Sequence, residues 1–303
     1  MRCFSHVRPR LVYRNRNLQN FAACNRLPAG LDDLCHGYIK KVRNNCTGMT
    51  PEEADLYLKD LGLINPDSDM QRLWSFGKSL IGETEMQGLR NWITGGGGQA
   101  EEYLLNKCES DQFFRIIHSQ KYDLFKQELI WLDTFLPSNA LVADLGCNTG
   151  HLTTIMARMR PFSRFFGFDS LDRPLKKARR LKEAFKCKRL TFERHDVFGL
   201  QVTPKPDGLV SLQGVGLALS SKPHADAVCN IADSQAFFGL VERFENRDRF
   251  KSVCDNLESN GFICAHQSLL RVNSLFCKGH QPAFIFTRGY PNKQIPFDAI
   301  TLS

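Results

Sequence analysis

The chain has 303 residues, of which 42 % are hydrophobic and 24 % are charged. These proportions are ordinary for a globular protein and exclude wholesale disorder. The sequence has no run of about 18 apolar residues, so we expect no membrane span. Its length allows two modest domains or one domain with a large appendage.

The formal net charge is +8, and two stretches carry most of the excess. Residues 1–31 contain no Asp or Glu but six arginines: Arg2, Arg8, Arg10, Arg14, Arg16 and Arg26. This composition predicts a basic N-terminal arm that is a frayed tail, a targeting segment or a nucleic-acid contact. Residues 158–194 hold thirteen Lys or Arg against four acids. RNA or an acidic protein is therefore a candidate partner.

The chain has 11 cysteines and no CxxC pair. This argues against a zinc ribbon or a redox dithiol, and we expect no metal site. An odd number of cysteines without a secretory signal predicts reduced thiols in an intracellular protein. We expect a cytoplasmic location, with a mitochondrial one as the alternative because of the acid-free arm.

Residues 32–136 have the pattern of a helical segment. Thr50, Pro51 and Glu53 form a capping-box signature, which predicts a helix over 51–61. Residues 100–136 repeat apolar clusters at three- and four-residue spacing, which is typical of amphipathic helices. Four glycines, 95–98, separate these two groups and predict a hinge or a mobile loop.

From residue 137 onward, short apolar runs alternate with amphipathic stretches, which is typical of βαβ units. Five predicted strands end near Asp144, Asp169, Asp196, Gln213 and His266. Residues 282–289 and 297–303 are predicted as a closing antiparallel hairpin. The expected fold is α/β, with a Rossmann-like, mostly parallel seven-stranded sheet over 137–303, preceded by the helical segment.

The strongest motif is VADLGCNTGHLTTIMARM, in which a strand ends at Asp144 and a helix begins near His151. Gly146 and Gly150 bracket the turn, and glycine permits a ligand to approach the backbone closely. Asn148 lies between them and tolerates a left-handed conformation better than most residues do. The motif therefore predicts a ligand-binding loop at the carboxyl end of the first strand.

Asp-Leu-Gly-Cys-Asn-Thr-Gly resembles the first motif of class I S-adenosylmethionine-dependent methyltransferases, and the resemblance covers residues 140–303. It implies S-adenosylmethionine as the cofactor. It also implies that the loop binds the amino-acid end of the cofactor, Asp169 binds the ribose hydroxyls and Asp196 meets the adenine amino group. The cofactor-binding residues expected on this basis are Asp144, Gly146, Cys147, Asn148, Gly150, Asp169, Asp196 and Gln213.

Some alternatives stay open at this point. A dinucleotide-binding oxidoreductase has a similar loop, but position 151 is His where that motif has its third glycine. Asp169 and Asp196 are also suited to be ordinary helix caps, which Asp favours. Cys147 is expected to be a small spacer, because transfer from a sulfonium needs no enzyme nucleophile.

The acceptor region after the fourth predicted strand lacks the Asp/Asn-Pro-Pro-Tyr tetrapeptide of amino-methylating nucleic-acid enzymes. Residues 212–216, LQGVG, are distantly similar to Leu-His-Ala-Cys-Gly in a methyltransferase-like group that includes the glutathione S-transferase C-terminal-domain-containing protein. Two of the five positions agree, and Gln213 stands where that segment has His. None of the four histidines near this end of the sheet is assigned as a catalytic base: His151, His195, His224 and His266.

Residues 172–190 predict an amphipathic helix. Its apolar face carries Leu175, Ala178, Leu181 and Phe185, and a solvated basic face is expected to carry Lys176, Lys177, Arg179, Arg180 and Lys182. The sequence as a whole favours a methyltransferase with a macromolecular acceptor, RNA or protein. The alternative is a catalytically silent methyltransferase-fold protein that binds or assembles partners, because Asn148 and Gln213 depart from the commonest motifs.

Overall fold

The computed structural model describes residues 48–66, 70–95, 107, 110–242, 247–273 and 278–289. The basic arm 1–31, three of the four consecutive glycines and the predicted strand 297–303 lie outside these residues. Among the residues so described, no helix is both long enough and apolar enough to cross a membrane.

A seven-stranded sheet forms the centre of the molecule, in the order β3-β2-β1-β4-β5-β7-β6. β1 to β5 run parallel, and β7 is antiparallel to both of its neighbours, β5 and β6. The strands are β1 (Leu141–Leu145), β2 (Arg164–Asp169), β3 (Leu190–Arg194), β4 (Gly208–Leu212), β5 (Ala236–Val241), β6 (Ile263–Asn273) and β7 (Lys278–Arg288). The predicted Rossmann-like class, the strand number and the mostly parallel sheet are confirmed.

Two details of the strand prediction were wrong. The fifth strand, β5, was not predicted: all six of its residues are buried, and a continuous apolar run of this length does not show the alternation of a half-buried strand. The closing hairpin is formed by β6 and β7, whereas residues 282–289 were predicted to pair with 297–303. Residues 282–289 were thus correctly predicted to form an antiparallel strand, but with the wrong partner.

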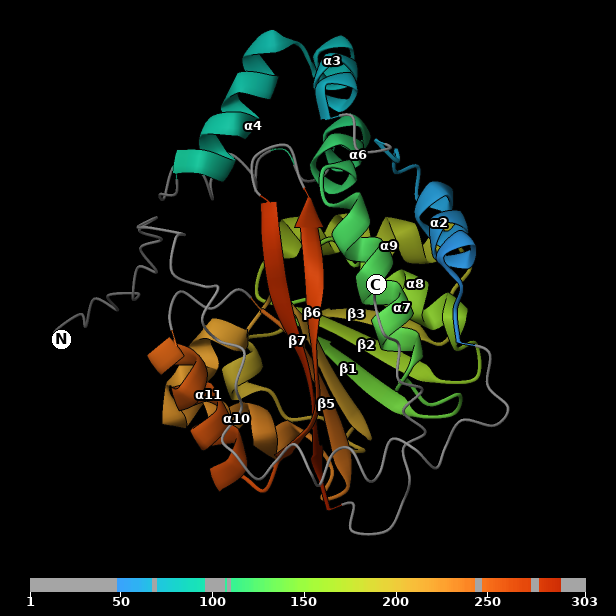
Figure 1. The fold of residues 1–303 in the computed structure, drawn as a ribbon. Coiled ribbons are helices and arrows are strands. Elements are labelled where there is room, and N and C mark those ends of the chain that lie inside the picture. Colours follow the sequence, from blue (N-terminus) through green and yellow to red (C-terminus); the bar gives the residue numbers. More distant parts are fainter. Residues whose placement is uncertain are drawn as a thin grey trace, which may run out of the picture.

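Helices cover both faces of the sheet (Figure 1). One face carries α10 (Lys222–Ile231) and α11 (Arg247–Ser259), and the other carries α7 (Tyr122–Asp133), α8 (His151–Met159) and α9 (Asp172–Ala184). Successive residues of one strand enter opposite cores, as Val142 and Ala143 of β1 and Phe237 and Phe238 of β5 do. Burial on both faces explains why the central strands are apolar throughout.

The helical N-terminal segment packs directly on this core. α2 (Pro51–Asp60) begins with the predicted capping box, in which Thr50 and Glu53 exchange side-chain hydrogen bonds with backbone N–H groups. α2, α7 and α8 share one apolar cluster, and side chains of α7 also enter the core against the sheet. The domain boundary expected at residue 137 stays a prediction, since the packing continues across it.

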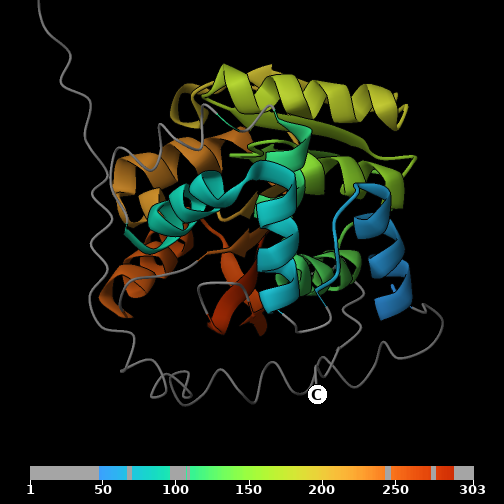
Figure 2. The same cartoon turned by 90° about the horizontal axis from the view of Figure 1, so that it is seen from above.

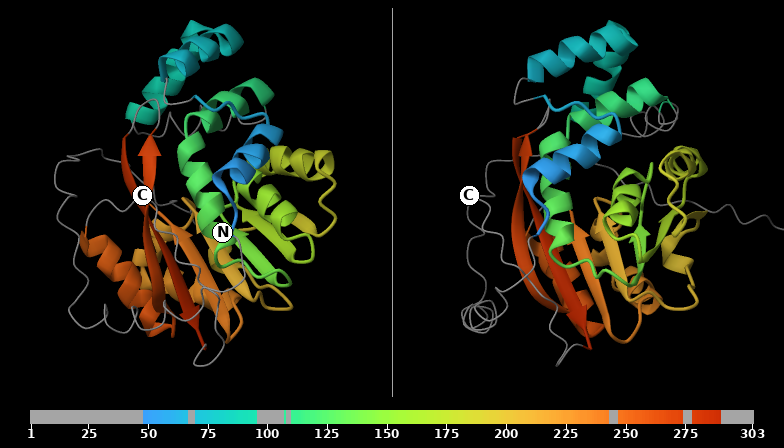
Figure 3. Two further views of the ribbon diagram at one scale, coloured as in Figure 1. Left: turned by 45° about the vertical axis from the view of Figure 1, so that its right-hand side comes forward. Right: turned by 90° about the vertical axis from the view of Figure 1, so that its right-hand side faces the viewer.

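The remaining helices lie at one end of the sheet. β6 runs antiparallel to β7 and so points in the same direction as β1 to β5, and its arrowhead marks the carboxyl ends of those strands in Figures 1 and 3. α3 (Met70–Ile81), α4 (Glu83–Gly95) and α6 (Asp111–Ser119) lie at this end. In the view from above, α3 and α4 cross in front of the sheet (Figure 2). The helical segment therefore caps the edge where open parallel sheets bind ligands.

One residue of the predicted basic face of α9 is placed differently from expectation. Lys177 is buried, with its ammonium group over the ring of Phe114 and paired with Asp111 at the start of α6. Lys176, Arg179 and Arg180 are exposed, as expected. Lys177 thus joins α9 to the capping helices, because a cation on an aromatic ring with an acidic partner is tolerated in a buried place.

Candidate functional site

The loop between β1 and α8 has the unusual backbone that its sequence predicted. Gly146, Asn148 and Gly150 adopt left-handed conformations with φ of 79°, 50° and 65°. The N–H groups of Gly146 and Cys147 both donate to the carbonyl oxygen of Phe168, over 2.8 and 3.0 Å. The loop is therefore fastened to the end of β2, and Asn148 adopts the glycine-like conformation expected of it.

The two glycines of this loop are required for different reasons. A Cβ at Gly146 would lie 3.0 Å from the backbone of Gly214, just beyond the end of β4. A Cβ at Gly150 would lie 2.5 Å from the ring of Phe192 and 2.6 Å from the side chain of Ala178. Gly146 thus permits close approach of two strand ends, whereas Gly150 permits close packing of α8 against β3 and α9.

Asp169 at the end of β2 holds the loop through its carboxylate. One oxygen accepts a hydrogen bond from the N–H of Asn148 over 2.8 Å, and the other accepts from the N–H of Leu171 over 2.9 Å. α9 begins after Leu171 and has no side-chain cap, so Asp169 is not the cap of that helix. Burial raises the pKa of Asp169, and its backbone hydrogen bonds oppose that rise.

Asp196, the third predicted acid, lies after β3 on the surface. Its carboxylate accepts a hydrogen bond from the N–H of Phe198 over 3.1 Å and caps the short helix η2 (Val197–Gly199). The capping role that Asp favours is therefore present at this position. The adenine contact implied by the resemblance stays a prediction.

Asp144 and Cys147 are both buried at the loop. Asp144 accepts a hydrogen bond from the hydroxyl of Thr153 over 2.5 Å, and burial raises its pKa to about 7. Burial, followed by the charges of Asp144 and Asp169, raises the pKa of the Cys147 thiol well above its usual value. A thiol held in this way is a poor nucleophile, which agrees with the expectation that Cys147 is a spacer.

Gln213 follows β4 and connects two residues that the sequence did not point to. It has a left-handed backbone, with φ of 60°. Its amide oxygen accepts a hydrogen bond from Lys121 Nζ over 2.8 Å, and its amide nitrogen donates to Glu128 Oε1 over 3.2 Å. We call Lys121, Glu128 and Gln213 the β4-end cluster. The second carboxyl oxygen of Glu128, Oε2, is buried and has no hydrogen-bond partner within the described residues.

Glu128 has the most perturbed carboxyl of the site. It is fully buried, and burial raises its pKa to about 8, with the neighbouring Asp144 adding to the rise. The hydrogen bond from Gln213 and the charge of Lys121 oppose this shift. A sequence signal for Glu128 exists, since it lies four residues after Leu124 and four before Leu132, both on the buried face of α7.

A second polar group lies beneath the loop. The hydroxyl of Thr149 is 3.2 Å from Nε2 of His118 in α6 and 3.1 Å from Nδ1 of His151 in α8. The centroids of the two imidazole rings are 4.1 Å apart. Burial lowers the pKa of His151 to about 3 and that of His118 well below its usual value, so both rings are neutral. The histidines are thus part of the packing under the loop.

The other three histidines considered from the sequence have different surroundings. His195 is exposed beside the ring of Phe168, and His224 stacks on Phe198. His266 is half-buried in β6 and hydrogen-bonded to Ser268 over 2.8 Å. No catalytic base is assigned to any of them. In the described parts of the chain, no group of three or more His, Cys, Asp or Glu residues is arranged to hold a metal ion.

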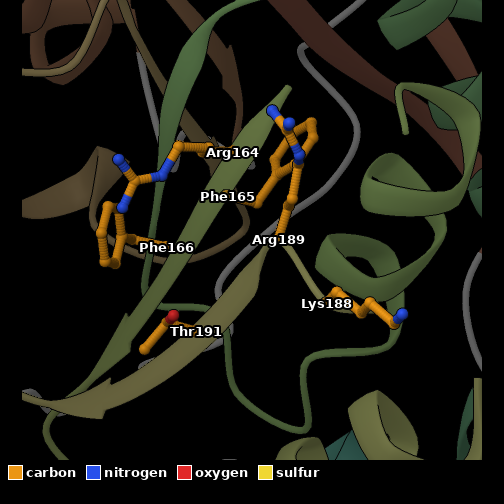
Figure 4. Close-up of a pocket in the computed structure, with 6 residues that line it drawn as sticks. All are labelled: Arg164, Phe165, Phe166, Lys188, Arg189 and Thr191. Carbon is orange, nitrogen blue, oxygen red and sulfur yellow. The ribbon is translucent and has the colours of Figure 1, made fainter. Parts of the chain in front are cut away.

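A pocket of about 270 Å³ lies on β2 and β3 (Figure 4). It is lined by Arg164, Phe165, Phe166, Lys188, Arg189 and Thr191. Arg164 begins β2 and Leu190 begins β3, so the pocket lies at the amino ends of these strands, away from the loop. Its three cationic side chains and two phenylalanines make it suited to an anionic ligand rather than to the cofactor.

Comparison with known proteins finds a family similar to the central part of the chain. Residues 136–268 match the family model described as a methyltransferase domain. No curated protein sequence matches the chain.

Three solved structures are among those similar to the chain. TrmN from Thermus thermophilus has 17 % identity and a TM-score of 0.41, and the match covers 50 % of this chain and 44 % of that one, which is less than half its length. The magnesium protoporphyrin IX methyltransferase of Synechocystis PCC 6803 has 17 % identity and a TM-score of 0.45, covering 72 % and 97 %. The [4+2]-cyclase SpnF has 12 % identity and a TM-score of 0.48, covering 55 % and 82 %.

The family match covers the parallel strands of the sheet and the loop between β1 and α8. It also covers Asp169, which accepts a hydrogen bond from Asn148 of this loop. The sequence motif, the strand order and the family model thus agree on the same residues. Residues 136–268 are therefore similar to a methyltransferase domain, and the loop and Asp169 lie within the matched segment.

Proposed function

We propose that the chain is an enzyme that transfers the methyl group of S-adenosylmethionine to a macromolecule, and that this acceptor is RNA. The observation that carries the cofactor assignment is the left-handed loop at the end of β1, which Asp169 holds from the end of β2. In open parallel sheets a ligand lies across the carboxyl ends of such neighbouring strands.

The residues present fit this cofactor. Each carboxylate oxygen of Asp169 accepts one backbone N–H, and a carboxylate oxygen has two lone pairs, so further bonds from ribose hydroxyls are chemically suited. Asp196 lies one strand further along the sheet, on the side where adenine would follow the ribose. The cofactor, when bound, supplies an electrophilic methyl group. The chain itself would orient that group, and orientation alone is a large part of such catalysis.

The surface charge supports an RNA acceptor. Lys176, Arg179 and Arg180 are exposed on α9, which starts directly after the loop's partner strand. Arg164 lies over the ring of Phe166 in the pocket described above, which Arg189 also lines. Cations interleaved with aromatic rings favour a nucleic acid over an acidic protein, because bases stack on rings while phosphates pair with cations.

Two measurements test the proposal. Calorimetry on the full chain is expected to detect binding of S-adenosylmethionine and none of NAD, and the reverse result would identify an oxidoreductase. Incubation with S-adenosylmethionine carrying a radioactive methyl group is then expected to label RNA from a total extract. Label in the protein fraction would refute the RNA acceptor, and tight cofactor binding without any transfer would indicate the silent binding protein.

A further inference from the structure

The β4-end cluster of Lys121, Gln213 and Glu128 is a second polar site beside the loop, and its chemistry is distinctive. The amide of Gln213 lies between a cation and a carboxyl group and is hydrogen-bonded to both. The carboxyl group is buried, yet only one of its two oxygens has a partner among the described residues. A buried polar atom without a partner is costly in a folded protein, so a ligand atom is expected to complete it.

The position of the cluster follows from the strand order. The sheet runs β3-β2-β1-β4, so a ligand that extends across the loop from Asp169 at β2 reaches the end of β4. Gly146 in the loop and Gly214 after β4 are in close contact, which makes the two strand ends one continuous surface. If adenosine occupies the Asp169 side, the opposite end of the cofactor lies toward Gln213.

We propose that Glu128 and Lys121, both held by Gln213, bind the two charges of the cofactor's amino-acid group, Glu128 its ammonium and Lys121 its carboxylate. This inference rests on the proposed function and specifies which side chains hold one end of the cofactor. The amino-acid group carries both charges on one carbon, and Gln213 holds a cation and an ionisable carboxyl group close together.

The protonation of Glu128 agrees with this role. Burial and the nearby Asp144 keep the carboxyl group largely protonated in the unliganded chain, although the charge of Lys121 opposes this. An ammonium group placed at Oε2 would favour the ionised form and would replace the missing hydrogen-bond partner. Two charged groups face Glu128. The acidic one is Asp144 at the end of β1, and the basic one is Lys121 before α7.

The test compares ligands that carry different parts of the amino-acid group. Affinities of wild type, Glu128→Gln and Lys121→Met are measured by calorimetry for three ligands: S-adenosylmethionine, its decarboxylated form, which keeps the ammonium and the sulfonium, and 5′-methylthioadenosine, which lacks the whole amino-acid group and the sulfonium charge. Glu183→Gln, whose side chain is 80 % exposed on α9, is the matched control. Melting temperatures of all variants establish that they are folded.

Glu128→Gln is expected to lower the affinity for S-adenosylmethionine about tenfold or more and to leave that for 5′-methylthioadenosine unchanged. Lys121→Met is expected to lower the affinity for S-adenosylmethionine but not the affinity for its decarboxylated form. Equal weakening of all ligands, or no weakening of any, would overturn the inference while the proposed function stands. Unchanged affinity with slower methyl transfer would assign Glu128 to the acceptor instead. If the wild-type chain does not bind S-adenosylmethionine, the proposed function itself fails.

Discussion

The loop after β1 and the β4-end cluster lie on neighbouring strands, but they are built in different ways. The loop consists of consecutive residues, and its left-handed backbone follows from Gly146, Asn148 and Gly150. The cluster is held together by two hydrogen bonds. Their partners are separated by 85 and by 92 positions in the sequence. Local sequence therefore specifies the first region, whereas the docking of α7 on the sheet creates the second. Substitutions in the two regions should fail in correspondingly different ways.

The largest effect is expected in the loop. Gly146→Val should abolish cofactor binding for two reasons. Gly146 has a left-handed φ, and the valine side chain would press on the backbone of Gly214. The contact also predicts some loss of stability. Gly199→Val is the control, since a Cβ there meets no atom within 4 Å. Calorimetry on folded protein measures the effect, and normal affinity in Gly146→Val would remove the loop from the site.

The next effect concerns the acids that follow the loop. Asp169→Ala should lower the affinity for S-adenosylmethionine about tenfold to a hundredfold, because it removes acceptors for the ribose and also frees Asn148. Asp196→Ala removes the cap of η2 and should lower the free energy of unfolding by about 1 kcal/mol. Affinity and melting temperature are measured on the same samples. A destabilised Asp169→Ala variant that binds normally would contradict the ribose role.

A smaller effect should appear in the dependence of stability on pH. Folding keeps Glu128 and Asp144 protonated up to about 8 and 7, so their contribution to stability is lost as the pH rises through these values. Folding keeps His118 and His151 neutral, so their contribution is lost as the pH falls below 6.5. Above pH 6.5, of these four groups only Glu128 and Asp144 change the stability. The melting temperature should therefore fall as the pH rises toward about 8.5.

Glu128→Gln sharpens this test, because glutamine keeps an acceptor for Gln213 but does not titrate. Its melting temperature should change less between pH 6.5 and about 8.5 than that of the wild type. Lys121 and Asp144 are retained in the variant as the charged groups that face this position. The same slope in both proteins would show that Glu128 does not carry the dependence.

The smallest effect is expected from the N-terminal arm. Deleting residues 1–31 should leave a folded, cofactor-binding protein, since this segment is rich in arginine and contains no acid to pair with the core. Cofactor affinity and melting temperature should match those of the full chain within error. Aggregation of the truncated chain, or weaker binding, would show that the arm contributes to the core.

Prediction from sequence succeeded where neighbours along the chain decide the structure. The capping box at Thr50 and the left-handed turn at Gly146 to Gly150 follow from interactions within a few residues. It failed for β5, whose buried residues form one apolar run without a period. It also failed for Lys177, because the partners that permit its burial, Asp111 and Phe114, come from a helix more than sixty residues earlier.

The sequence alone therefore determined the class of fold, the loop and the three acidic strand ends, since these depend on local backbone preference and hydrophobic pattern. Only the tertiary structure decided which polar side chains from distant parts of the chain contact one another. In the sequence Glu128 is one of three acids in α7, and only the packing of α7 on the sheet brings it to Gln213 and Lys121. Burial then raises the pKa of its carboxyl group, because a charge loses its hydration in a closed core.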